Sequence, residues 1–431
     1  MKKRISLDLL VSVPDDIKRV PKSEGILYVA RSNPSFMLLS EIESLIFEQI
    51  VEGKTVRQAA EYIARIDNFS IPLIEESTES LFDKIEHSGF YKDNSNFQEK
   101  IWPLHLYLTN SCNLKCRMCY KDAGLTKPNE LSTKEICQLI DEFSEQEGKS
   151  SIVLSGGEPL MHKKFLFIVE YVKQKGHRIS VVSNGLLIHS KSDAERISSL
   201  VDFFQISLDG ASEEFNDYYR GKGTYQRILD KINLFSGIDF KLNIGMIVSD
   251  YNFEDIHNNL GSLLSKLENK NLKINVSNII DFGRGTYCLS KGTRDMVHKI
   301  IRKVRGEGIH TKDWEVLNIR TYDCGFARSI TIDSDGSIYY CPVTHPFTSS
   351  GLNIRTTSFK DILKHFKEVN NSISVEHIPL CVDCELTYLC GGGCRIENMQ
   401  KTGSYMGQGI CDSSRKELIY DEMVLMREGK K

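Results

Sequence analysis

Three features that are missing from this chain of 431 residues limit the classes of protein to which it can belong. It has no run of about 18 apolar residues, which argues against a membrane-spanning helix. Its basic start is interrupted by Asp8 and followed by Pro14, without a small-residue cleavage site, so we expect no signal peptide and a cytoplasmic location. The formal net charge is −3, and no excess of basic residues indicates nucleic acid or a membrane as a partner.

Cysteine is absent before Cys112 and frequent afterwards. The chain has 12 cysteines, and five of them fall between Cys381 and Cys411. Structural disulfides are rare in a reducing compartment, so we expect these thiols to bind metal.

The first part of the chain, residues 1–95, has the pattern of a small separate module. A strand is predicted at 25–30, and three short helices follow it. Ser40 and Glu43 form a capping box for the first of these helices. This order predicts a winged-helix-like module, followed by a polar linker at 91–100.

From residue 101 onward, strands alternate with helices. We predict an α/β domain over 101–310 and a cysteine-rich domain over 311–431. Crossover helices between strands imply a parallel sheet, either open or curled into a partial barrel, with ligands at the carboxyl ends of the strands. The predicted strands are 104–109, 151–155, 178–183, 203–208, 241–249 and 272–280.

Cys112, Cys116 and Cys119 follow the first of these strands with C-x3-C-x2-C spacing. Three thiolates are one short of a four-cysteine site, so the residues alone leave two possibilities. Either a distant fourth ligand completes a zinc site, or the site is open.

Other polar and glycine residues follow the next strands of the predicted sheet. Each of them alone is ordinary turn chemistry. Their placement at successive strand ends, beside the triplet, predicts one common site. These residues are Gly156, Gly157 and Glu158 in "SGGEP", Ser183 and Asn184 in "SNG", Ser207, and Arg220.

With Met118 before its third cysteine, the triplet resembles the signature of the radical S-adenosylmethionine (SAM) superfamily. The resemblance implies a partial (β/α)6 TIM-like barrel and a [4Fe–4S] cluster bound by Cys112, Cys116 and Cys119. It implies that the fourth iron binds SAM, and that reduction by a flavodoxin- or ferredoxin-type donor produces a 5′-deoxyadenosyl radical.

The same resemblance implies which residues contact SAM. Gly156, Gly157 and Glu158 are expected at the methionyl amine, and the backbone at 245–246 beside the adenine. The resemblance also implies that the ribose or the carboxylate of SAM is contacted by Ser183, Asn184, Ser207 and Arg220.

The second cysteine region, "CVDCELTYLCGGGC" at 381–394, taken alone suggests a four-cysteine zinc site. With Cys324, Cys341 and Cys411, however, the spacing resembles the SPASM (twitch-type) extension of radical SAM enzymes. The resemblance implies an inner auxiliary [4Fe–4S] cluster on Cys324, Cys341 and Cys394, with an open iron or an unidentified ligand. An outer one is implied on Cys381, Cys384, Cys390 and Cys411.

Anaerobic sulfatase maturases carry an aspartate directly after the second cysteine of this extension. Pro342 stands there instead, which disfavours that activity. Asp323, beside Cys324, is either a candidate base or an exposed turn residue.

The front module resembles the leader-peptide recognition element of ribosomal-peptide (RiPP) maturases; a dimerisation or spacer domain is the alternative. Together the three parts predict an oxidoreductase that crosslinks a ribosomally made precursor peptide, with a thioether favoured, after its leader docks on residues 20–90. Other reactions remain open, namely carbon–carbon crosslinking, epimerisation, splicing, sulfatase-maturase-type oxidation and small-molecule oxidoreduction. A non-catalytic zinc or iron–sulfur module is the alternative outside enzymes.

Overall fold

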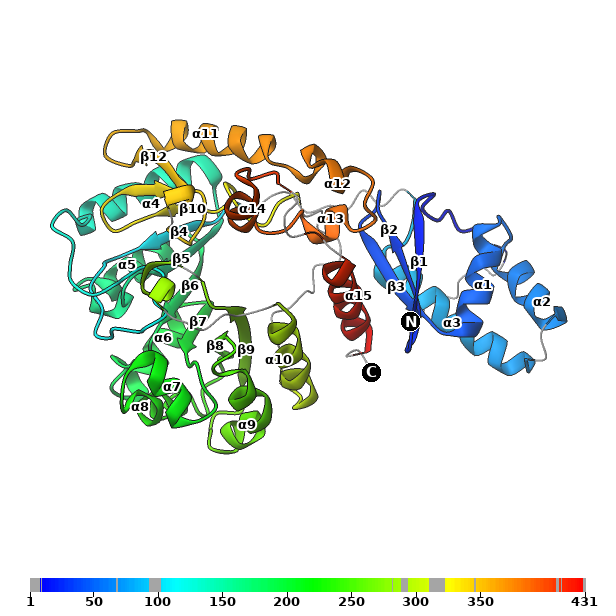
Figure 1. The fold of residues 1–431 in the computed structure, drawn as a ribbon, viewed down its shortest axis with the longest axis horizontal. Coiled ribbons are helices and arrows are strands. Elements are labelled where there is room, and N and C mark those ends of the chain that lie inside the picture. Colours follow the sequence, from blue (N-terminus) through cyan, green and yellow to red (C-terminus); the bar gives the residue numbers. More distant parts are fainter. Residues whose placement is uncertain are drawn as a thin grey trace. The chain divides into compact units, whose positions relative to one another are not determined.

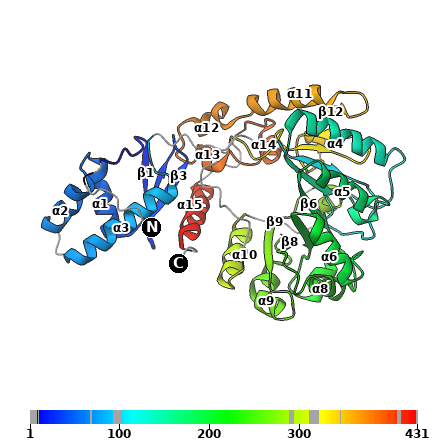
Figure 2. The ribbon, with the colours of Figure 1, turned by 180° about the vertical axis from the view of Figure 1, so that it is seen from behind.

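The computed structural model describes residues 8, 10–66, 69–92, 102–280, 282–287, 294–309, 322–344, 346–407, 411 and 413–428. Nearly all of the predicted linker at 91–100 lies outside these residues. The chain forms two compact units (Figure 1; Figure 2 from behind). The first comprises Met1–Glu99, Trp314–Cys324 and Ile373–Lys431, and the second comprises Lys100–Asp313 and Gly325–Ser372. Each unit is described by itself.

The second unit is built on a parallel sheet in which all six predicted strands are present. Neighbours in the sheet are consecutive in sequence, and every pair is parallel. The strands are β4 (Leu104–Tyr107), β5 (Ser151–Ser155), β6 (Arg178–Ser183), β7 (Phe203–Ser207), β8 (Leu242–Val248) and β9 (Leu272–Asn278). The prediction of an α/β fold with a parallel sheet is confirmed.

Crossover helices connect these strands and lie along the outside of the curved sheet (Figures 1 and 2). The predicted capping box of Ser132 and Glu135 begins the first of them. The helices of this region are α4 (Thr133–Glu147), α5 (Phe165–Gln174), α6 (Lys191–Leu200), α7 (Glu213–Arg220), α8 (Thr224–Asn233), α9 (Phe253–Ser265) and α10 (Arg294–Gly306).

Three further strands extend the same sheet beyond β4. Strand β10 (Ile330–Ile332) pairs in parallel with β4, and β11 (Ser337–Tyr339) and β12 (Ser349–Asn353) continue antiparallel. Helix α11 (Phe359–Ser372) completes this part. Ile330, Ile332, Leu104 and Leu106 are fully buried, as expected for paired strands covered on both faces. The division between the two units therefore differs from the predicted boundary at residue 310, and the three predicted domains remain a prediction.

The first unit begins with a three-stranded antiparallel sheet followed by three helices. The strands are β1 (Ile17–Lys22), β2 (Gly25–Ala30) and β3 (Ser35–Leu39). The helices are α1 (Glu41–Val51), α2 (Val56–Ile66) and α3 (Ile71–Ser88), and the capping box of Ser40 and Glu43 is confirmed. Only β2 was predicted among the strands. The winged-helix-like classification stays a prediction.

The cysteine-rich part of the first unit consists of short helical turns and one longer helix. They are α12 (Pro379–Val382), α13 (Thr387–Cys390), α14 (Arg395–Thr402) and α15 (Ser413–Glu428). No helix within the described ranges is long and apolar enough to cross a membrane.

The front sheet has two buried faces, because successive side chains of a strand point to opposite sides. Tyr28 and Met37 pack with helices α1 to α3, in the core that also contains Phe47. Leu27 and Phe36 pack in a second core with residues of the C-terminal part of the unit. The front module therefore shares a hydrophobic core with the cysteine-rich segment.

Candidate functional site

A cavity of ≈ 600 Å³ opens at the carboxyl ends of the parallel strands. It brings together residues from the exits of β4 to β8, as expected for a parallel α/β sheet. The predicted site residues that line it are Cys112, Cys116, Cys119, Gly156, Gly157, Ser183, Asn184, Ser207 and Arg220, together with the backbone neighbours Gly245 and Met246. Only Glu158 of the predicted set is missing from the lining.

The triplet cysteines lie on a loop held by main-chain hydrogen bonds. The Cys112 amide donates to Gly124 O at 2.9 Å, and the Arg117 amide to Tyr219 O at 2.8 Å. Burial raises the pKa of the Cys112 thiol to about 11 and also raises the pKa of Cys116. Without metal, the thiols of Cys112 and Cys116 are therefore protonated at neutral pH, and binding of iron must displace those two protons.

Gly156 and Gly157 are required by contacts with the chain itself. A Cβ at Gly156, whose φ is +148°, would lie 2.5 Å from Thr109 O, and one at Gly157 would lie 2.3 Å from Ser111 O. The Gly157 amide donates to Thr109 O at 2.7 Å. Both glycines therefore allow the chain to pass close to the strand exit that leads into Cys112, and their expected contact with the methionyl amine stays a prediction.

Glu158 is 1% exposed, and its carboxylate is occupied by neighbouring donors. It accepts from Ser183 Oγ at 2.7 Å, from the Asn184 amide at 2.8 Å and from the Leu160 amide at 3.2 Å. Burial raises the pKa of Glu158. In the structure it fixes Ser183 and Asn184, which line the cavity; its predicted contact with SAM stays a prediction.

Arg220 brings a buried positive charge to the cavity. Its Nε lies 2.6 Å from Asp209 Oδ2, and the other Asp209 oxygen accepts from the Ile247 amide at 2.8 Å. Burial disfavours the charged guanidinium, but Asp209 outweighs it and raises the pKa of Arg220. A fixed guanidinium beside three thiols is suited to an anionic ligand group.

Arg284 is a site residue that the sequence analysis missed. It follows β9, lines the cavity and bonds the cysteine loop: Nε donates to Cys116 O at 2.8 Å, and its amide to Cys119 O at 3.0 Å. Its Nη1 bonds Asp122 Oδ1 at 2.6 Å and Ala123 O at 2.8 Å. Gly283, with φ +60°, allows this approach, because a Cβ there would lie 2.4 Å from Tyr120 O. The "GRG" after the sixth strand was the available signal.

The auxiliary cysteines of the first unit form two groups. Burial, then the nearby thiols of Cys390, Cys384 and Cys411, raise the pKa of Cys381 to about 11, so the predicted outer set lies together. A hydrogen bond with Cys324 raises the pKa of Cys394, so these two predicted inner ligands are adjacent.

Cys341 belongs to the second unit, and the complete inner set therefore stays a prediction. Asp323 is 1% exposed, so its interpretation as an exposed turn residue was wrong.

The thiol groups are compatible with iron–sulfur clusters. In the described part of the chain, no three Cys, His, Asp or Glu side chains converge as ligands of one metal ion. A cubane is bound through separate irons, so its thiolates need not converge in this way. The barrel loop offers three thiols at a cavity, and the outer group offers four thiols in one place.

Comparison with known proteins identifies the barrel. Residues 106–262 match the radical SAM superfamily. This chain contains a radical SAM domain. Mycofactocin maturase MftC from Mycolicibacterium smegmatis is 25% identical over 308 residues, 67% of this chain and 76% of that protein. An AdoMet-dependent heme synthase from Oleidesulfovibrio alaskensis is 27% identical over 335 residues, 70% of this chain and 84% of that protein.

The solved structure of Streptococcus suis SuiB bound to the precursor peptide SuiA is also similar. It matches with a TM-score of 0.54 and 15% identity, and covers 93% of this chain and 99% of that one. At this identity the likeness establishes the fold alone, an α/β fold with a parallel central sheet.

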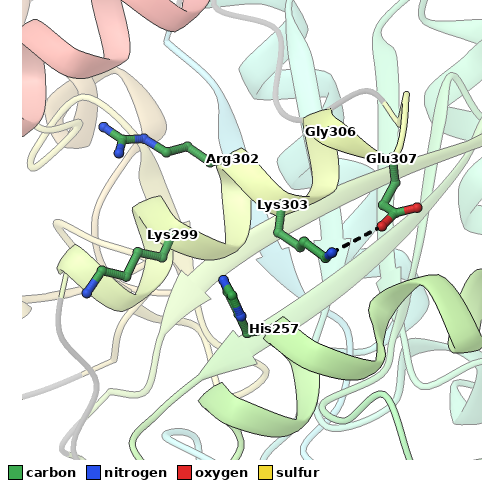
Figure 3. Close-up of a pocket in the computed structure, with 6 residues that line it drawn as sticks. All are labelled: His257, Lys299, Arg302, Lys303, Gly306 and Glu307. Carbon is green, nitrogen blue, oxygen red and sulfur yellow. Dashed lines mark ion pairs between the residues drawn. The ribbon is translucent and has the colours of Figure 1, made fainter.

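A second hollow of ≈ 390 Å³ lies between α9 and α10 of the second unit (Figure 3). It is lined by His257, Lys299, Arg302, Lys303, Gly306 and Glu307. Lys303 points toward Glu307, 3.4 Å away, while Lys299 and Arg302 extend away from that pair (Figure 3). None of the predicted site residues lies here, and we assign this hollow no role.

Proposed function

We propose that this protein is a radical SAM enzyme that forms an intramolecular crosslink, favouring a thioether, in a ribosomally made precursor peptide. The observation that carries the proposal is the single cavity at the strand ends in which three loop thiols meet the buried guanidinium of Arg220. The match of residues 106–262 to the radical SAM superfamily supports the same chemistry.

Cys112, Cys116 and Cys119 would hold a [4Fe–4S] cluster that leaves one iron for SAM. The bound cluster and SAM supply the 5′-deoxyadenosyl radical after one-electron reduction by a flavodoxin- or ferredoxin-type donor. The protein's part is binding and enclosure. Arg220 is suited to the SAM carboxylate, and the backbone at 245–246 to the adenine.

The remaining predicted contacts belong to the same proposal. Gly156, Gly157 and Glu158 would approach the methionyl amine, with Ser183, Asn184 and Ser207 at the ribose or carboxylate. Because Glu158 already accepts three hydrogen bonds, its effect on SAM would pass mainly through Ser183 and Asn184.

Two auxiliary clusters would suit an oxidative crosslink, since an electron must leave after hydrogen abstraction. We assign the outer one to Cys381, Cys384, Cys390 and Cys411, and the inner one to Cys324, Cys341 and Cys394. An open iron on the inner cluster would bind a substrate thiolate, which is why a thioether is favoured over a carbon–carbon bond.

The front module would recognise the leader of the peptide. Within the described residues β3 pairs only with β2, and α3 contacts β3, so an extended peptide could add as a strand beside this helix. The precursor peptide SuiA bound to SuiB and the name of MftC support a peptide substrate. A cytoplasmic location belongs to this proposal.

The proposal is tested by anaerobic reconstitution with iron, sulfide, dithionite and SAM. We expect 5′-deoxyadenosine and roughly 12 irons per chain, as three cubanes require. Co-expression with a short precursor encoded nearby should give a peptide about 2 Da lighter, the mass of two hydrogens lost in one crosslink. No 5′-deoxyadenosine would favour a non-catalytic metal-binding module, and an unchanged peptide mass would favour epimerisation.

A small-molecule radical SAM oxidoreductase is the second candidate, favoured by the similarity to an AdoMet-dependent heme synthase. The two candidates differ in their response to the leader. A peptide maturase should cleave SAM faster with the full precursor than with the leaderless core, whereas a small-molecule enzyme should respond to neither.

A further inference from the structure

The second face of the front sheet, which we call the cysteine-side face, packs against the segment that carries the predicted outer cluster. Its fully or nearly fully buried members are Leu27, Val29 and Phe36. They share one hydrophobic core with Leu386, Tyr420 and Met423, and Cys384, Leu389, Cys390 and Ile419 pack at its edge. Two of the four predicted outer ligands thus touch a core supplied by residues more than 300 positions earlier in the chain.

A polar rim closes this contact. Lys22, at the end of β1, bonds Glu417 Oε2 at 2.6 Å and Asp421 Oδ1 at 2.9 Å on α15. Its side chain is only 11% exposed, and its Nζ lies 5.5 Å from the centre of the Tyr420 ring. The Tyr420 hydroxyl in turn bonds Glu385, the residue after Cys384. Apolar contacts bordered by paired charges exclude water.

The short turns of the cysteine segment cover part of the predicted outer site themselves, because Cys381 packs in a separate small core with Val375 and Ile378. Helices α12 and α13 are four residues each, and no described strand runs through 373–428. The buried Arg415 donates to Cys390 Sγ at 3.4 Å. Beside Cys384 and Cys390, the apolar wall therefore comes from the front sheet and α15, together with Leu386 and Leu389 of the segment itself.

We propose that the front sheet is the water-excluding wall of the outer iron–sulfur site, a second role for this module besides leader recognition. This inference rests on the proposed function only for the presence of the outer cluster. The stability of a cluster toward chelators and oxygen depends on solvent access to its sulfurs. The front module should therefore set the lifetime of the outer cluster even when no peptide is bound.

The test uses the full chain in a Cys112→Ala, Cys116→Ala, Cys119→Ala background, so that only auxiliary iron is present. Val29→Thr places a hydroxyl in the cysteine-side core without changing shape. Val56→Thr is the matched control, because Val56 is equally buried but lies in the core on the other face of the sheet. Phe36→Ala opens a larger gap on the cysteine side.

Iron release to a chelator and bleaching in dilute oxygen are followed by absorbance and by the spectrum of the reduced clusters. We expect Phe36→Ala to release one cluster about tenfold faster, with a smaller increase for Val29→Thr and none for Val56→Thr. Thermal unfolding checks that the two threonine variants are equally destabilised. Cys384→Ala identifies which spectral component belongs to the outer cluster.

If Val29→Thr, Phe36→Ala and Val56→Thr release iron at equal rates, the front sheet is not the wall of the outer site. The proposed function would be unaffected by that result. A parent protein that takes up no auxiliary iron would overturn both. Faster release from the cysteine-side variants alone supports the wall.

Discussion

The two cysteine sites of this protein are built in opposite ways. The triplet Cys112, Cys116 and Cys119 stands at the exit of a parallel strand and lines a cavity, while Arg284 and main-chain hydrogen bonds hold its loop. Of the predicted outer group, Cys384 and Cys390 lie on or beside short helical turns and pack against a sheet from an early part of the chain. Topology positions the first site, and burial against a distant element supports the second. A site of the first kind should respond to changes in its own loop and buried charges, and one of the second kind to changes far away in sequence.

The largest effect is expected from removing one thiol of the barrel loop. Cys116→Ala should abolish SAM cleavage, because two thiolates cannot hold the cluster, and should lower the iron content by about four per chain. Auxiliary-cluster absorbance should persist, since that site has separate ligands. The measurement is 5′-deoxyadenosine by chromatography, with the half-buried Cys137→Ala as control. Cleavage by the Cys116 variant at the parent rate would contradict this comparison.

Next in size is the buried ion pair behind the barrel site. Asp209→Asn leaves the Arg220 guanidinium without its partner at 2.6 Å and should lower the free energy of unfolding by about 3–5 kcal/mol. Urea unfolding of the metal-free protein measures it. The control Glu170→Gln breaks an exposed pair, 3.1 Å from Arg196, and should cost less than about 1 kcal/mol. If both variants lose the same free energy of unfolding, burial does not increase the energetic cost of breaking the Asp209–Arg220 pair.

The stability of the parallel sheet behind the barrel site should also depend on pH. Burial, with a smaller contribution from Lys121, lowers the pKa of His105 on β4 to about 4. The folded pKa lies below the unfolded value near 6.5, so the unfolded state binds the proton more readily. The contribution of His105 to the free energy of unfolding is fully present above pH 6.5. It should be lost, by roughly 2–3 kcal/mol, as the pH drops from 6.5 through 4. His105→Asn should flatten that part of the pH profile of unfolding; an unchanged slope would assign the acid sensitivity to other groups.

The smallest effect is expected at the clamp on the cysteine loop. Arg284→Gln loses the charge-assisted bonds to Cys116 O and Ala123 O, and should cost about 1–2 kcal/mol. The loosened loop should also weaken SAM binding, seen as a smaller change in the spectrum of the reduced cluster when SAM is added. Arg196→Gln, on the surface, is the matched control. If both variants bind SAM as the parent does, Arg284 is not part of the site.

The parts of this molecule that could be predicted are those whose structure depends on residues close together in the sequence. The six parallel strands read as apolar runs between helices, and the cysteine spacing with "SGGEP" located the cavity. Pairing between strands that are far apart in the sequence left no such signal. Strand β10 is three residues long, and its partnership with β4 is not visible in either segment. The wrong interpretation of Asp323 has the same origin, since burial depends on what packs against a turn.

Contacts made by the site residues were also only partly predictable. The sequence grouped Arg220 and Glu158 with the other strand-end residues, but it did not show that Asp209 pairs with Arg220 or that Glu158 bonds Ser183 and Asn184. Arg284 was missed because an arginine between two glycines reads as an ordinary turn. These are matters of side-chain direction, which a one-dimensional pattern does not contain.

The shared core of the front sheet has a consequence for the order of biosynthesis. Leu27, Val29 and Phe36 leave the ribosome well before Tyr420 and Met423, which cover them, have been made. At typical elongation rates this interval is on the order of 20–80 s, during which the nascent chain carries an open apolar face. Chaperones that shield such surfaces therefore have this whole interval in which to bind the front module, and the predicted outer ligands can be enclosed only after α15 has been made.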